Sequence, residues 1–95
     1  MRRVLASVNI FAESSQIDNV ALALSKLDNI EEVYEVAGEY DLVTLVSAST
    51  LEEFRDVLQK KIMKIKGVKS TISTVVLKLH KGAKCRERLV ITSTK

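Results

Sequence analysis

Residues 33–46, VYEVAGEYDLVTLV, decide the fold because they hold two apolar runs on either side of a polar turn. Residues 33–37 and 42–46 are rich in valine and in other residue types that favour strands. Between them, Gly38-Glu39-Tyr40-Asp41 has the composition of a turn. Because the second run is nearly all apolar, we predict that residues 42–46 form a central strand of a sheet.

The chain before this hairpin predicts a strand and then a helix. Residues 4–11 form the strand, and Ser15 with Asp18 resembles a capping box that opens the helix. Asp28-Asn29 ends the helix. One face of the strand carries Val4, Ala6, Val8 and Ile10, and the other carries Leu5, Ser7, Asn9 and Phe11. The apolar stripe of the helix consists of Ile17, Val20, Ala21, Leu24 and Leu27.

The chain after the hairpin repeats this pattern. Ser49 or Thr50 opens a second helix, with Glu52 and Glu53 three residues on. Gly67 stands where the end of a helix favours a residue that tolerates positive φ. The apolar stripe of this helix consists of Leu51, Phe54, Val57, Leu58, Ile62 and Ile65. Further strands are predicted at residues 68–79 and 89–91.

The two halves of the chain correspond at an offset of 38 residues, so that Val4-Leu5 aligns with Leu42-Val43 and Ile30 with Val68. A duplicated strand–helix–strand unit predicts an α+β, ferredoxin-like βαββαβ fold with an extra C-terminal strand. Residues 1–95 then form a single domain, with both helices on one face of a four-stranded antiparallel sheet. We expect a second copy to cover the other, apolar face, as in dimeric α/β barrels.

The composition is that of one small globular domain. The 95 residues are 46% hydrophobic and 28% charged, and no apolar run is long enough to span a membrane. The basic start, Met1-Arg2-Arg3, lacks a signal-peptide pattern. One cysteine and one histidine provide neither an internal disulfide nor a zinc cluster, so we expect a cytoplasmic protein without a metal or a cofactor.

Charge divides unevenly along the chain. Residues 1–59 carry 11 acidic and 4 basic side chains, whereas residues 60–95 carry 1 acidic and 11 basic ones. A basic half suits acidic partners, but its lysines between residues 60 and 66 also fit the solvent side of a helix. Halves of opposite sign favour attraction between copies of the chain, unless the fold interleaves them.

No arrangement of residues predicts catalysis, so we do not expect an enzyme. His80 lies at the end of a strand among lysines, and Cys85, between Lys84 and Arg86, has no base near it in the sequence. The chain has no nucleotide-binding or hydrolase motif. It contains two tyrosines, two phenylalanines and no tryptophan, and residues 42–46 hold none of them, which argues against RNA binding of the RRM type. No helix-turn-helix is present to read DNA.

Two features suit the binding of a small zwitterion. The turn Gly38-Glu39-Tyr40-Asp41 offers backbone groups and a carboxylate, and the predicted strand at residues 68–79 places Lys69, Thr71 and Ser73 on one side. Hydroxyls and N–H groups would hold the carboxylate of the ligand, and Asp41 would hold its ammonium. Alternatively, Asp41 bonds the backbone of a tight hairpin, and the hydroxyl residues belong to an ordinary solvent-exposed strand. Residue types leave both interpretations open.

Short motifs spread over nearly the whole chain resemble one known family. They are Gly38-Glu39-Tyr40-Asp41-Leu42-Val43, residues 51–58, Ile65-Lys66-Gly67-Val68, Thr71, Ser73, Val75-Val76-Leu77 and Leu89-Val90-Ile91. Together they resemble the effector domain of the leucine-responsive/asparagine-type (Lrp/AsnC) transcriptional regulators, a module called RAM. The resemblance implies a βαββαβ homodimer, often assembled into a ring such as an octamer, that binds an amino acid between neighbouring dimers. The implied ligand contacts are Gly38, Glu39, Tyr40, Asp41, Lys69, Thr71, Ser73 and Thr74.

Regulators of this family also carry an N-terminal helix-turn-helix, whereas Met1 here directly starts the first RAM strand. The resemblance therefore implies a stand-alone amino-acid sensor that does not bind DNA itself and that modulates transcription indirectly, with full-length Lrp/AsnC-type regulators as candidate partners. Two alternatives are an ACT-like amino-acid-binding domain and a small dimeric α/β-barrel enzyme. Residues 11–15 lack the Pro and Gly of the usual ACT turn, and the inward helix positions are aliphatic or Phe54.

Overall fold

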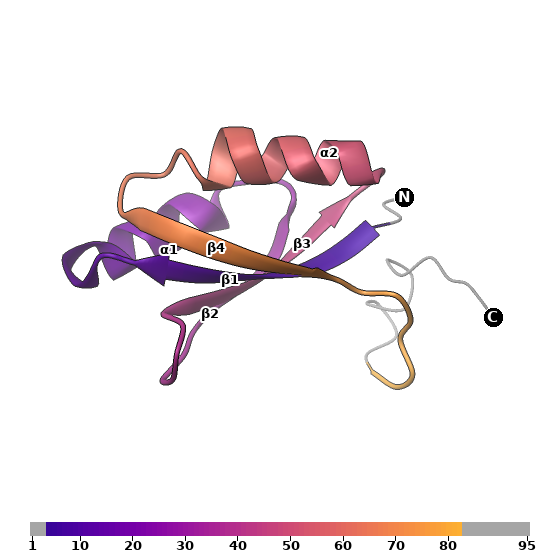
Figure 1. Ribbon diagram of the computed structural model, residues 1–95, viewed down its shortest axis with the longest axis horizontal. Coiled ribbons are helices and arrows are strands. Elements are labelled where there is room, and N and C mark those ends of the chain that lie inside the picture. Colours follow the sequence, from indigo (N-terminus) through magenta and orange to yellow (C-terminus); the bar gives the residue numbers. More distant parts are fainter. Residues whose placement is uncertain (1–3, 83–95) are drawn as a thin grey trace.

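The computed structural model describes residues 4–82, which form a four-stranded antiparallel sheet with two helical segments on one face (Figure 1). In chain order the elements are β1 (Val4–Ala12), the 3-10 turn η1 (Ser14–Gln16), α1 (Ile17–Ser25), β2 (Ile30–Glu35), β3 (Leu42–Ala48), α2 (Leu51–Asp56), its π-helical continuation η2 (Val57–Ile62) and β4 (Val68–Val75). The strand order is β2-β3-β1-β4. This confirms the predicted α+β, ferredoxin-like arrangement, and β3 is a central strand as expected.

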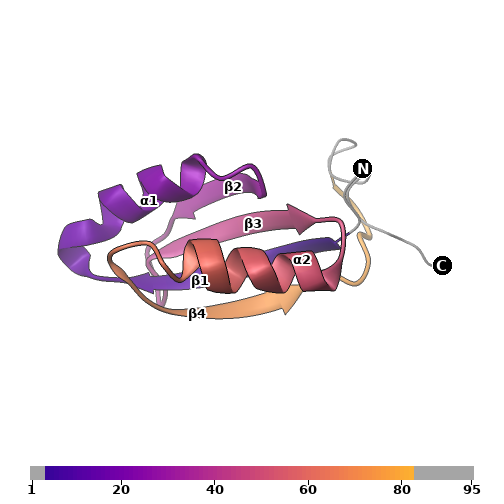
Figure 2. The same ribbon diagram turned by 90° about the horizontal axis from the view of Figure 1, so that it is seen from above.

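The internal repeat is visible in the element boundaries. β1 begins at Val4 and β3 at Leu42, and β2 begins at Ile30 and β4 at Val68, so both pairs are separated by 38 residues. Seen from above, α1 lies along the β2 side of the sheet and α2 along the β4 side (Figure 2). Each half of the chain thus supplies one central strand, one helix and one edge strand.

The core lies between the helices and the sheet. On β1, the alternate residues Ala6, Val8 and Ile10 are fully buried against the helices, as the alternation predicted. α1 contributes Val20 and Leu24, both with an exposed fraction of 0%. The helix on the other side contributes Phe54, Val57, Leu58, Ile62 and Ile65. In η2, the N–H of Met63 bonds the carbonyl of Leu58 at 2.9 Å, and this wider helical turn brings residues five apart onto the sheet side.

The start of α2 follows the prediction, whereas the start of α1 does not. The Thr50 hydroxyl accepts from the N–H of Glu53 at 3.0 Å, and the Glu53 carboxylate accepts from the N–H of Ser49 at 2.7 Å, one residue before the place that a capping box uses. The predicted box at Ser15 and Asp18 is wrong. Ser15 lies inside η1, so α1 begins one residue later than a Ser15 cap requires and has no side-chain cap.

Two further expectations need correction. Leu51 is 56% exposed, so the apolar stripe of α2 begins at Phe54. β4 ends at Val75 instead of residue 79, because within residues 4–82 it pairs with β1 alone and the last bond joins the N–H of Val76 to the carbonyl of Leu5 at 2.8 Å. Beyond Leu5, little of β1 remains to pair with. The predicted strand at 89–91 lies outside the described residues, as does Cys85.

The face of the sheet opposite the helices is partly apolar. Tyr34 on β2 is 51% exposed, and Ile72 on β4 is 49% exposed. Phe11, Val43 and Leu45 lie on the same face and are half-buried. This open face is therefore the apolar surface that the sequence predicted, and it is not covered within the described chain.

Candidate functional site

The turn between β2 and β3 is built around Asp41. Its N–H donates to the Ile10 carbonyl at 3.0 Å, and its carbonyl accepts from the N–H of Val36 at 3.1 Å. Its carboxylate Oδ2 accepts from the N–H of Ala12 at 2.8 Å. The pairing of β1 with β3 ends at Ile10 and Leu42. The Asp41 side chain therefore provides an acceptor for the N–H of Ala12, which lies beyond the last paired residue of β1. One of the two interpretations predicted that the Asp41 side chain bonds the backbone of its own hairpin. The side chain does bond a backbone N–H, but this N–H belongs to β1.

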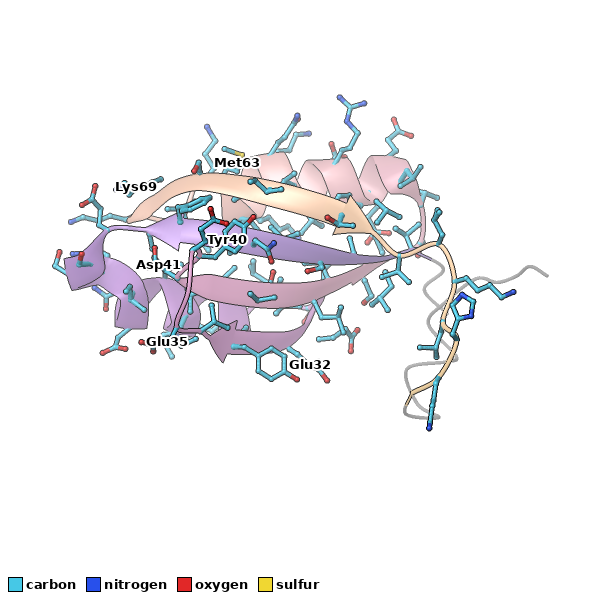
Figure 3. The ribbon with its side chains drawn as sticks, turned by 60° about the horizontal axis from the view of Figure 1, so that its bottom comes forward. Glu32, Glu35, Tyr40, Asp41, Met63 and Lys69 are labelled. Carbon is cyan, nitrogen blue, oxygen red and sulfur yellow. The ribbon has the colours of Figure 1, made fainter. Side chains whose placement is uncertain are left out.

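The same turn keeps one carboxylate oxygen available. Within residues 4–82, Oδ1 of Asp41 accepts no hydrogen bond, and the residue is half-buried. Next to it, the Tyr40 ring packs against Phe11 with centroids 4.9 Å apart and planes inclined by 56°. Tyr40 and Asp41 come from neighbouring positions of the turn (Figure 3). The turn therefore combines a carboxylate with a small aromatic surface. The alternation of β1 predicted the face on which Phe11 lies, but it did not indicate the contact between Phe11 and Tyr40.

The residues of β4 that were predicted to contact a ligand point to two different faces of the sheet. Thr71 and Ser73 pair with Ile10 and Val8 of β1, whose side chains point into the helix-covered core, so the two hydroxyl residues share that side as predicted. Thr74 follows Ser73 directly and points to the open face. Thr71 is half-buried, and the other two are exposed.

Lys69 lies at an irregularity of the strand. Ala12 pairs with Val68 and Phe11 pairs with Ser70, which leaves Lys69 between two paired residues without a partner in β1. The expectation that Lys69 is in line with the hydroxyl residues assumed a regular strand, and this bulge interrupts the alternation on which it depends. Lys69 is exposed at the outer edge of the sheet.

The turn and the first residues of β4 meet at the same end of β1. Asp41 bonds Ile10 and Ala12 from the β3 side, and Thr71 and Val68 pair with the same two residues from the β4 side. Ser73 and Thr74 pair with residues farther along β1. The end of the sheet thus holds Gly38, Glu39, Tyr40, Asp41, Lys69 and Thr71, the larger part of the predicted set.

Sequence reasoning missed a buried polar cluster near the other end of β3. Asn29, which is 4% exposed, donates through Nδ2 to the Ser47 carbonyl at 2.8 Å and to Glu53 at 3.0 Å. The Ser47 hydroxyl donates to Glu31 at 2.6 Å. Only the Thr50–Glu53 spacing signalled any part of this cluster. It ties the beginning of α2 to β3 and to the turn before β2.

The described residues hold few groups suited to catalysis. No group of three or more His, Cys, Asp or Glu side chains in residues 4–82 is placed to hold a metal ion. Within the same range, every buried side-chain nitrogen or oxygen has a hydrogen-bond partner, and His80 is exposed beyond the end of β4. None of the helices described is both long enough and apolar enough to cross a membrane.

The order of elements and the strand order β2-β3-β1-β4 define the class of the protein as an α+β domain of the ferredoxin-like type. The sequence profile described as the Lrp/AsnC ligand binding domain matches residues 5–84, and the chain belongs to this family. The match confirms the resemblance seen in the motifs and favours it over the ACT-like alternative.

Relatives of known sequence are transcription regulators and, over a shorter stretch, an enzyme. The HTH-type transcriptional regulator FL11 of Pyrococcus furiosus is 36% identical over 78 residues, which cover 82% of this chain and 51% of the regulator. The chain thus spans about half the length of the curated relatives that it matches first. Homocitrate synthase of Saccharolobus islandicus is 35% identical over 60 residues, which cover 63% of this chain and 13% of the enzyme.

Solved structures share the fold. TTHA0845 of Thermus thermophilus has a TM-score of 0.78 and 30% identity, with 83% of this chain and 99% of that chain covered. AsnC of E. coli has a TM-score of 0.82 and 24% identity, with 87% and 56% covered. The transcriptional regulator NMB0573 of Neisseria meningitidis, solved as a complex with L-Met, has a TM-score of 0.79 and 17% identity, with 85% and 54% covered. TTHA0845 is matched over nearly its whole length, so this fold also occurs in chains of similar size.

Proposed function

We propose that this chain is a regulatory module that binds a small amino acid between copies of itself and modulates transcription through full-length Lrp/AsnC-type regulators. The observation that carries the proposal is the match to the family of ligand-binding domains over residues 5–84, which is nearly the whole described fold. The L-Met complex of the Neisseria meningitidis regulator supports an amino acid as the class of ligand.

The groups at the end of the sheet suit a zwitterion. Oδ1 of Asp41 accepts from the ligand ammonium while Oδ2 stays bonded to β1 at 2.8 Å. The Thr71 hydroxyl, the Lys69 ammonium and the N–H groups of the turn hold the ligand carboxylate. Tyr40 offers apolar surface to the ligand side chain. The other predicted contacts are Gly38 and Glu39 of the same turn, Ser73 on the side of Thr71, and Thr74 on the opposite face, where it reaches a ligand only if a second copy holds the ligand there.

A second copy is needed to close this site. Five of its eight residues are exposed in the single chain, namely Gly38, Glu39, Lys69, Ser73 and Thr74. Small-molecule sites bury most of the surface of their ligand, so a neighbouring subunit has to cover these residues. The ligand then favours the assembly with the better-formed site, and it shifts the equilibrium only by its difference in affinity for the two states.

We also propose that the open face of the sheet forms the homodimer contact. Tyr34 and Ile72 are 51% and 49% exposed there, and they lie on the same face as the half-buried Val43 and Leu45. Covering these side chains with the same face of a second copy removes apolar surface from water, which is the main favourable term in stable association. The dimer is the unit from which a ring of dimers is built.

Calorimetric titration with each of the twenty amino acids, together with light-scattering mass before and after addition, tests this function. We expect saturable binding of one or a few amino acids, accompanied by a change in mass. If no amino acid binds to the wild-type chain, the sensor function is wrong.

Asp41→Asn is the variant that locates the site. Asparagine keeps an oxygen for the N–H of Ala12 but removes the charge, so the turn stays intact while the attraction for an ammonium is lost. We expect ligand affinity to fall by about tenfold or more, since hydrogen bonds to charged groups contribute about 1.5–3 kcal/mol. Glu39→Gln is the matched control, because it removes an exposed carboxylate from the same turn. Equal affinity in the wild type and Asp41→Asn would place the ammonium elsewhere.

A further inference from the structure

An amide side chain stands among apolar residues on the open face of the sheet. Asn9 belongs to the central strand β1, and its neighbours across the two ladders are Val43 of β3 and Ile72 of β4. The alternation of β1 turns Asn9 away from the helices, onto the same face as Phe11, and Figure 3 views the molecule from this side. Strands use asparagine sparingly, whereas both of its neighbours are β-branched residues that strands favour. Strand formation therefore does not explain this residue.

The amide of Asn9 has no partner within the part of the chain that the structure describes. Asn9 is half-buried, and among residues 4–82 its side chain takes part in no hydrogen bond. Its nitrogen and oxygen are reached by solvent, since every buried side-chain nitrogen or oxygen in this range is bonded. The equivalent residue of the repeat, Ser47, is 0% exposed, and its hydroxyl donates to Glu31 at 2.6 Å. One repeat thus satisfies its polar group internally, and the other leaves a donor and an acceptor open.

Asn9 also lies near the middle of the part of this face that is free. Leu5 and Ser47 point to the same face at one end of the sheet, but they are already buried, with exposed fractions of 3% and 0%. On β1 the free part therefore runs from Ser7 to Phe11, and Asn9 is its midpoint. A contact between two identical faces is mapped onto itself by a two-fold axis, which passes through the middle of the contact. Residues at the middle then meet their own copies.

We propose that the amide of Asn9 bonds the amide of the partner's Asn9 across the two-fold axis, and that this pair decides which faces the module accepts. Sheets stacked face to face lie about 10 Å apart, a gap that two side chains reaching from opposite sides span. An amide carries donors and an acceptor, so two amides related by a two-fold axis form two reciprocal N–H···O bonds. The inference rests on the proposed contact between sheet faces, and it adds the residue that sets the register of this contact and its choice of partner.

In this contact the apolar side chains supply strength and the amide pair supplies selectivity. A partner face with an aliphatic residue at this position leaves the donor and acceptor of Asn9 buried without a bond, which costs more than the bonded pair contributes. A shift along the strands has the same effect, because the amide then meets apolar neighbours. A single buried asparagine sets register and partner choice in coiled coils by the same mechanism. The face therefore favours a second copy of this chain over related modules that carry an aliphatic residue there.

Exchange between copies gives the first test. Wild-type chains and Asn9→Leu chains, one of them carrying a short tag, are mixed in equal amounts, and native mass spectrometry counts the three kinds of dimer. Random pairing makes mixed dimers half of the total. We expect the mixed share to lie about threefold or more below this value, because the mixed dimer alone buries an unpaired amide. Both parent chains should remain dimers, since the apolar face accommodates an aliphatic pair on the axis.

A charge on the axis gives the second test. Asn9→Asp places two carboxylates against each other where little water remains, so at pH 7 we expect dimerisation to weaken by about tenfold or more. Sedimentation velocity over a range of protein concentrations measures this loss. Ser70→Asp is the matched control, because Ser70 is exposed on the same face but belongs to the edge strand β4, away from the axis. We expect it to dimerise like the wild type, and circular dichroism shows whether both variants keep the fold.

The outcomes separate this inference from the proposed function. Mixed dimers at the random share, or an Asn9→Asp chain that dimerises as tightly as Ser70→Asp, would show that the amides do not meet, and would overturn the inference while the sheet contact stands. A wild-type chain that stays monomeric would overturn the sheet contact and the amide pair together. Selective pairing by a chain that binds no amino acid supports the amide pair and removes the sensor function.

Discussion

At the scale of single residues, Gly67 joins two segments that are far apart in the sequence. Its φ of +103° lies in the region that only glycine adopts readily, and its carbonyl accepts from the N–H of Glu13 at 2.8 Å. A Cβ at this position would lie 2.5 Å from Cβ of Gln16 and 3.0 Å from Cγ2 of Val20. The loop before β4 therefore packs closely against the beginning of the first helix, and both the backbone angle and the space require glycine.

We expect Gly67→Ala to lower the free energy of unfolding by about 2 kcal/mol, because strained backbone of this kind costs about 1–3 kcal/mol before the steric contact is counted. Urea denaturation followed by circular dichroism measures this loss. Gly38→Ala is the control, since a Cβ there meets no atom within 4 Å and the backbone φ is not positive. An unchanged unfolding midpoint for Gly67→Ala would show that the loop does not approach the helix so closely.

At the scale of elements, the two helices differ in how they begin, although they occupy equivalent places in the repeat. α2 is capped by the Thr50 hydroxyl, and the Glu53 side chain accepts from the N–H of Ser49 and from the buried Asn29. α1 has no side-chain cap, and its first turn is preceded by η1. The equivalent segments thus use different means to satisfy the free N–H groups at the start of a helix.

This difference predicts unequal costs for two similar substitutions. Thr50→Ala should lower the free energy of unfolding by about 1 kcal/mol, which is typical for the loss of a capping side chain. Ser15→Ala should change it by less than about 0.5 kcal/mol, as expected for an exposed residue without such a bond. Thermal unfolding of both variants compares the two effects directly. A larger loss for Ser15→Ala than for Thr50→Ala would contradict the assignment of the caps.

The sequence predicts elements well where their cause is local and poorly where it is distant. The repeat at offset 38 and the apolar alternation predicted all four described strands and both helices, because burial of one face follows a fixed period. The turn η1 was missed; its own bond, from the N–H of Gln16 to the carbonyl of Glu13, is local, but Glu13 is also held by Gly67, more than fifty positions away. The bulge at Lys69 and the early end of β4 depend on the register with β1, which no local pattern contains.

The candidate site shows the same limit. The carboxylate at Asp41 and the hydroxyl groups of the strand were visible as residue types, but the N–H that Asp41 binds belongs to Ala12, 29 positions earlier. Thr74 was grouped with Ser73 in the sequence, yet adjacent strand residues point to opposite faces. Pairing between strands, and not residue type, decides which side chains can reach one ligand.

At the scale of the whole molecule, two surfaces point in different directions. The open face of the sheet is apolar around Tyr34 and Ile72, whereas the outer edges are formed by β2 and β4. An apolar contact on the face leaves both edges accessible, so one chain has room for a dimer partner and for neighbours beside it.

The dimer contact predicts that Ile72→Lys lowers the mass of the assembly while Leu22→Lys does not. Both side chains are about half exposed, at 49% and 58%, but Ile72 lies on the open face and Leu22 on the first helix. Burying an isoleucine contributes about 1.5–3 kcal/mol, and a lysine in its place brings a charge that must stay hydrated, so we expect dimerisation to weaken by at least about tenfold. Sedimentation velocity over a range of protein concentrations measures the dimerisation of each variant. A monomer from Leu22→Lys and a dimer from Ile72→Lys would place the contact on the helices instead of the sheet.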